Sequence, residues 1–102
     1  MQQPDSALLQ RVREQVAGYV VPSPNATMYF MEDNERHGYA AVSVPREHKN
    51  KARVVVMARV EANKVIIETD ITDKPLHQAL QQAGIKQQQI VLAYMGETEP
   101  MA

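Results

Sequence analysis

Hydrophobic and polar residues recur along the chain with two periods, and each change of period marks a predicted element. Near the N-terminus apolar residues recur every three or four positions, which predicts a helix over residues 6–19. Asp5 and Ser6 are residue types that cap helices, and Pro22 and Pro24 end this one because proline lacks an amide proton. The apolar positions of this helix are Leu8, Leu9, Val12, Val16, Tyr19 and Val20.

Five short segments then show the composition and alternation of β-strands. They cover residues 27–31, 37–44, 53–60, 65–70 and 90–94. The first four are joined by short polar links, so we expect them to form an antiparallel meander.

A second helix is predicted between the fourth and fifth strands. Thr72 and Asp73 can cap it, and Pro75 fits its first turn, where a missing N–H is harmless. Gly84 is a typical residue for ending a helix, and Ile85 can make the hydrophobic contact that accompanies such an end. One apolar stripe is expected on this helix, formed by Leu76, Ala79, Leu80 and Ala83.

These elements predict an α+β fold, with an antiparallel-rich five-stranded sheet and two helices packed on one face. The length of 102 residues fits a single domain. We expect residues 1–4 and 96–102 to be flexible.

Two short helices cannot cover both faces of such a sheet. Alternation along the third strand places one apolar set under the helices, namely Val54, Val56, Ala58 and Val60. The other face is predicted to be an apolar patch ringed by charge, which is typical of a protein interface. Its members are predicted to be Tyr29, Met31, Tyr39, Val55 and Met57. The alternative is that loops and the tail cover part of the patch, or that the register places these residues elsewhere.

Charge and composition restrict the function classes. The net charge is −1, so electrostatics gives no general reason to expect a nucleic-acid partner. The chain has no cysteine and no apolar run long enough to cross a membrane. The first ten residues lack the basic and apolar stretches of a signal peptide, so we expect none. We therefore expect a cytoplasmic protein without disulfides or thiolate metal sites.

A basic cluster lies between the second and third strands. Four of its cations are the candidates for contact with phosphate or with an acidic partner: Arg46, Lys49, Lys51 and Arg53. Glu47 dilutes this cluster, and no aromatic residues are interleaved for base stacking. The alternative is a solvated loop that shields the edge of a strand.

No catalytic or metal-binding motif is present. Glu68 and Asp70 alternate on one strand, and such a pair can bind Mg²⁺ or perform acid–base chemistry. The alternative, a solvent-facing strand end, is favoured. The three histidines lack metal-ligand spacing and are expected on the surface: His37, His48 and His77. We expect no catalytic residue, metal or cofactor.

Residues 65–96 carry a family resemblance. The segments VIIETD, KPLHQALQQAGI and QQQIVLAY follow one another there, with Ala-Gly-Ile at 83–85 and Ile-Val-Leu at 90–92. In this order they resemble the XisI family, the small excision-controlling factors of cyanobacteria. Residues 33–42 fit the family more loosely, and the chain lacks the tryptophan that typical members carry after the second strand.

The resemblance implies an accessory role. The founding factor acts with a companion, XisH, and with a separate recombinase to excise a DNA element during heterocyst differentiation. The resemblance therefore implies a non-enzymatic regulatory protein that acts as a homo-oligomer or with an XisH-like companion. It leaves open whether the protein contacts DNA, directly or through a partner. Direct DNA binding through residues 46–53 is the alternative.

Overall fold

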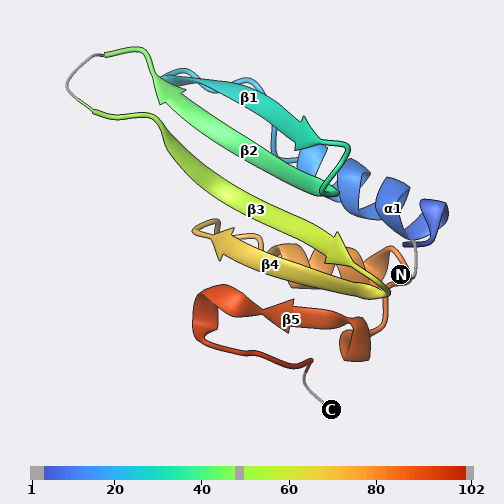
Figure 1. Ribbon diagram of the computed structural model, residues 1–102. Coiled ribbons are helices and arrows are strands. Elements are labelled where there is room, and N and C mark those ends of the chain that lie inside the picture. The colour runs from blue at the N-terminus through green and yellow to red at the C-terminus, as the bar shows by residue number, and fades with distance from the viewer. Residues whose placement is uncertain (1–3, 48–49, 101–102) are drawn as a thin grey trace.

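A five-stranded sheet with both helices on one of its faces makes up the molecule (Figure 1). The structure is a computed structural model, and it describes residues 4–47 and 50–100. The helices are α1 (Ser6–Ala17) and α2 (Leu76–Gln82). The strands are β1 (Ala26–Asp33), β2 (Gly38–Pro45), β3 (Arg53–Glu61), β4 (Lys64–Asp70) and β5 (Ile90–Leu92). The predicted α+β fold is confirmed.

The strands lie in the sheet in the order in which they occur in the sequence. Strands β1 to β4 pair antiparallel, as the short links between them predict. Strand β5 pairs parallel with β4, because α2 carries the chain back to the other end of the sheet. The sheet therefore has two unlike edges, the eight-residue β1 and the three-residue β5.

The core lies between the helices and the sheet face they cover. Nine core side chains have no exposed area: Val12, Val16, Ala41, Val56, Ala58, Val65, Ile67, Leu76 and Leu80. They come from both helices and the three central strands, so this one layer supplies most of the hydrophobic stabilisation.

Helix α1 begins as predicted and ends earlier than predicted. The Asp5 side chain accepts a hydrogen bond from the Ala7 amide at 2.9 Å, which is an N-cap. The helix ends at Ala17 and not at Tyr19, with Gly18 as its C-cap. The hydroxyl of Tyr19 instead donates to the backbone carbonyl of Lys74, which ties the end of α1 to the segment before α2.

The start of α2 is stabilised by a residue outside the predicted cap. Asp70 Oδ2 accepts from the Leu76 amide at 2.7 Å, and Asp70 Oδ1 accepts from both the amide and the hydroxyl of Thr72. Pro75 is the N-cap residue, and no side chain in that position bonds the helix. The prediction of Thr72 or Asp73 as the direct cap is therefore wrong, because the last residue of β4 reaches the helix across the turn.

The end of α2 follows the prediction. Gly84 has a φ of 96°, which only glycine adopts without strain. The Ile85 amide donates to the Leu80 carbonyl and the Gly84 amide to the Gln81 carbonyl, both at 3.0 Å, which is the Schellman pattern. Ile85 is buried and makes the predicted hydrophobic contact.

Two β-bulges interrupt the alternation of the central strands. Ala41 pairs with Val56 and Val42 with Val54, so Val55 is an extra residue on β3. Met57 pairs with Thr69 and Ala58 with Ile67, which makes Glu68 the extra residue on β4. Each bulge shifts the following residues by one position, so faces assigned by strict alternation change there.

Two hydrogen bonds turn the chain back after β5, and the expected flexibility of residues 96–102 stays a prediction. Strand β5 ends at Leu92, short of the predicted Tyr94, and a 3₁₀ turn spans Ala93–Met95. Glu97 Oε1 accepts from the Leu92 amide at 2.9 Å, and the Glu97 amide donates to the Leu92 carbonyl at 3.2 Å. The segment therefore folds back along the β5 edge of the sheet (Figure 1).

Candidate functional site

The sheet face opposite the helices carries an apolar surface. We call this surface the open face, and its members are Tyr29, Met31, Val42, Val54, Met57 and Ile66. Tyr29 is 45 % exposed, Met31 53 % and Val54 39 %. Val42 of β2 lies between Tyr29 of β1 and Val54 of β3, so the exposed side chains belong to one continuous apolar patch. Such patches mark protein contacts.

Three of the placements that alternation predicts for the two faces are wrong. Tyr39 pairs with Ala58 and is only 5 % exposed, so it lies under the helices, where it stacks on Phe30 at a centroid distance of 6.5 Å. The bulge turns Val55 toward the helix layer, where it is 9 % exposed, and moves Val54 to the open face. Tyr29, Met31 and Met57 lie on the open face as predicted.

Three members of the open face are not among its predicted residues: Val42, Val54 and Ile66. Val42 alternates with Tyr39 and Ala41, so its face could have been read once the helix side was known. Val54 could not, because nothing in the run of three valines marks which one is the bulge.

Charged side chains border the open face near the turn between β3 and β4. Arg59 Nε donates to Glu68 Oε2 at 2.8 Å, and Arg59 Nη1 donates to Glu61 Oε2 at 3.0 Å. The hydrogen bond to Glu68, and to a smaller extent the one to Glu61, raises the pKa of the Arg59 guanidinium. This cluster gives the apolar surface a polar rim, as protein interfaces have.

The predicted carboxylate pair is not assembled. The bulge at Glu68 breaks the alternation, and Asp70 pairs with Val56 on the helix-covered face. Glu68 bonds Arg59, whereas Asp70 bonds Thr72 and the start of α2. Both carboxylates are therefore committed to structural contacts on different faces.

The basic cluster lies in the segment between β2 and β3, at the end of the sheet opposite the turn between β3 and β4. Arg46, Lys51 and Arg53 are exposed, and Lys49 lies outside the described residues, as does His48. Arg46 is held to the sheet, because its amide donates to the Asn25 carbonyl at 3.1 Å and its guanidinium donates to the Pro24 carbonyl at 3.2 Å.

An ion pair connects helix α1 to strand β1. Arg13 on α1 donates to both carboxylate oxygens of Glu32, at 2.8 and 3.1 Å. The Arg13 guanidinium also lies 5.0 Å from the centroid of the Phe30 ring, within cation–π range. The Arg13 hydrogen bond holds the pKa of Glu32 below its usual range.

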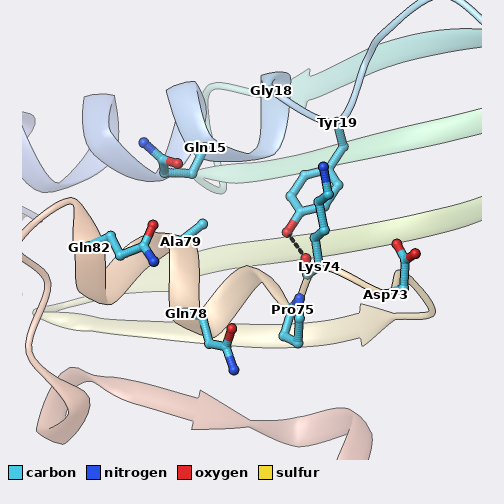
Figure 2. A pocket seen from close by; sticks show the side chains of 9 residues that line it. All are labelled: Gln15, Gly18, Tyr19, Asp73, Lys74, Pro75, Gln78, Ala79 and Gln82. Atoms are coloured by element: carbon cyan, nitrogen blue, oxygen red, sulfur yellow. Dashed lines mark hydrogen bonds between the residues drawn. The ribbon is translucent and has the colours of Figure 1, made fainter.

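A polar groove lies between the two helices (Figure 2). Its volume is about 420 Å³, and Figure 2 shows the Tyr19–Lys74 hydrogen bond crossing one end. It is lined by Gln15, Gly18, Tyr19, Asp73, Lys74, Pro75, Gln78, Ala79 and Gln82. This lining contains one carboxylate, Asp73, and no histidine.

The histidines form no site in the described part of the chain. His37 and His77 are half-buried, so neither is the fully solvated side chain that the sequence predicts. The Nδ1 atom of His77 is buried without a hydrogen-bond partner in the structure. Residues 4–47 and 50–100 contain no group of three or more histidines and carboxylates able to hold a metal ion.

Within residues 4–47 and 50–100, no helix has the length and apolar character needed to span a membrane.

Comparison with known proteins gives the family. The XisI family model matches residues 3–100, although no curated protein matches the chain significantly. The crystal structure of a XisI-like protein from Anabaena variabilis superposes with a TM-score of 0.75 at 21 % identity, covering 84 % of this chain and 83 % of that one. The fdxN element excision controlling factor XisI from the same organism superposes with a TM-score of 0.63 at 19 % identity, covering 85 % and 86 %. The chain belongs to the XisI family.

Proposed function

We propose that this chain is a non-enzymatic factor that takes part in controlling the excision of a DNA element. Membership of the XisI family over residues 3–100 carries this proposal. The commitment of Glu68 and Asp70 to structural contacts supports a role without catalysis.

The factor acts through protein contacts made by its open face. Tyr29, Met31 and Val54 expose apolar area that gives no stability to the isolated chain, so its burial against a partner is favourable. The Arg59 cluster supplies the polar rim of this contact. The partner is an XisH-like companion, and the recombination chemistry belongs to a separate enzyme.

Calorimetric titration of the companion into this chain tests the proposal. Val54→Lys places a charge in the open face, and we expect it to weaken binding by at least about tenfold. The matched control is Gln78→Lys, which adds the same charge to an exposed position on α2 and should leave the affinity unchanged. Equal affinities for the two variants, or no binding by the unmodified chain, contradict the proposal.

Direct DNA binding is the second candidate. It is favoured by the exposure of Arg46, Lys51 and Arg53 at one end of the sheet. If these cations contact phosphates, the DNA affinity falls steeply with salt, and replacing each by alanine reduces the slope of log K against log salt by about one. Absent or salt-independent binding removes this candidate.

A further inference from the structure

The two edges of the sheet differ in how they are protected. Strand β5 has three residues, and the backbone of Leu92 is bonded by Glu97. Strand β1 has eight residues, and within the described chain no backbone pairs with its outer edge. Because alternate residues of an edge strand direct their N–H and C=O groups outward, β1 presents a row of unpaired hydrogen-bonding groups.

Strand β1 also lacks the features that keep an edge strand from pairing. Such features are lysine, proline, a bulge or a very short strand. The centre of β1 reads TMYFM without a charge, and its register with β2 is unbroken from Ala26 to Asp33. The carboxylates at its end are already paired within the chain, Glu32 with Arg13 and Asp33 with Arg36.

We propose that two copies of the chain pair antiparallel along β1, with the two-fold axis at Tyr29. This register places Thr27 of one copy opposite Met31 of the other and pairs the two Tyr29 side chains on the open face. Residues directly opposite across two strands share a face, so apolar side chains meet apolar or hydroxyl side chains. Like charges do not meet, because Glu32 lies opposite Ala26.

One carboxylate and one cation meet at each end of the paired strands. Asp33 is already paired with Arg36, so Glu35 is the carboxylate of this turn for which the described residues give no ion pair. The register places the turn beside Asn25 of the other copy, whose carbonyl accepts from the Arg46 amide. The exposed Glu35 of one copy and the exposed Arg46 of the other therefore come to the same end of the joined strands, twice in a symmetric pair.

The pairing closes at two copies. Among the residues that the structure describes, β1 is the long edge without a backbone partner, whereas β5 has three residues and is bonded by Glu97. A two-fold contact uses the β1 edge of both copies, so no further strand adds there. Both open faces lie on the same side of the joined ten-stranded sheet, which doubles the surface for a companion. The pairing itself does not depend on the companion.

Light scattering after size-exclusion chromatography tests the pairing. We expect the chain alone to have twice its mass of 11.5 kDa. Tyr29→Lys puts two like charges at the axis and should return the mass to that of one chain. Val54→Lys, a matched change on β3, should keep the paired mass while losing the companion. A single-chain mass for the unmodified protein, or a paired mass for Tyr29→Lys, overturns the proposal.

Disulfide cross-linking tests the register. The chain has no cysteine, so one introduced thiol is unique. Tyr29→Cys should form a disulfide between copies on mild oxidation, since directly opposed Cβ atoms lie about 4.5–5.5 Å apart. Val54→Cys should stay a thiol. Cross-linking through Val54→Cys and not through Tyr29→Cys indicates a face-to-face dimer and overturns the proposal.

Discussion

The two faces of the sheet are built from similar apolar residues but differ in how far those residues are buried. Val56 and Val54 lie two positions apart on β3, yet Val56 is fully buried beneath the helices and Val54 is 39 % exposed. The covered face stabilises the isolated chain, because its apolar area is removed from water. Less apolar area is removed from water on the open face, where Tyr29, Met31 and Val54 stay exposed. The proposed contact with another chain would bury this area.

The largest difference between the faces should appear at neighbouring isoleucines of β4. Ile67 is fully buried and Ile66 lies half-buried on the open face. We expect Ile67→Ala to lower the free energy of unfolding by about 2–5 kcal/mol, because it removes core contacts and leaves a cavity. Ile66→Ala should cost about 1 kcal/mol. Urea denaturation measures both, and equal losses would contradict the assignment of the faces.

The second largest loss of stability is expected where Asp70, the last residue of β4, caps the start of α2. Asp70→Ala leaves the amide of Leu76 without its acceptor and should cost about 1–3 kcal/mol. Asp73→Ala, at the exposed position that the sequence suggests as a cap, should change stability by less than about 0.5 kcal/mol. Thermal unfolding of the two variants separates these cases, and a larger loss for Asp73→Ala would restore the cap at that position.

A smaller, stabilising effect is expected at the turn that sets the register of β3 and β4. Ala62 has a φ of 56°, which costs a residue with a Cβ atom about 1 kcal/mol relative to glycine. Ala62→Gly should therefore raise the free energy of unfolding by about that amount. Asn63→Gly, at a residue outside the left-handed region, should lower it. A loss of stability in Ala62→Gly would show that the turn has another conformation.

The smallest effect is a pH dependence of the ion pair over β1. The pKa of Glu32 is lowered from 4.5 by Arg13, so the unfolded state binds its proton more readily than the folded state. The stabilisation is present above pH 4.5 and is lost as the pH falls through the folded pKa. Glu32→Gln should remove this part of the acid dependence, whereas Glu35→Gln, on the exposed turn, should retain it. Identical acid unfolding curves for Glu32→Gln and the unmodified chain would refute the ion pair's contribution.

Features that depend only on residues close together in the sequence are predicted correctly. The cap at Asp5 and the end of α2 at Gly84 depend on residues within one turn, and both are confirmed. The cap from Asp70 depends on a turn that brings residues six positions apart into contact, which no propensity encodes.

The two faces are predicted only in part, because bulges depend on pairing between strands. The bulge at Val55 exchanges the faces of two valines, and the bulge at Glu68 separates the carboxylates. The prediction for Tyr39 is wrong because alternation shows which residues share a face and not which face the helices cover. The predictions for Tyr29 and Met31 are correct because the register between β1 and β2 has no shift. The prediction for Met57 is correct because Met57 lies between the core residues Val56 and Ala58, and alternation holds over these three residues.

Oxidative footprinting of methionines tests the central claim, that the open face is a protein-contact surface. Met31 and Met57 lie on this face, and Met95 is 67 % exposed at the turn after β5. When the XisH-like companion is added, we expect slower oxidation of Met57 and Met31 and an unchanged rate at Met95. Protection of Met95 alone, or unchanged rates at all three methionines, would contradict the account.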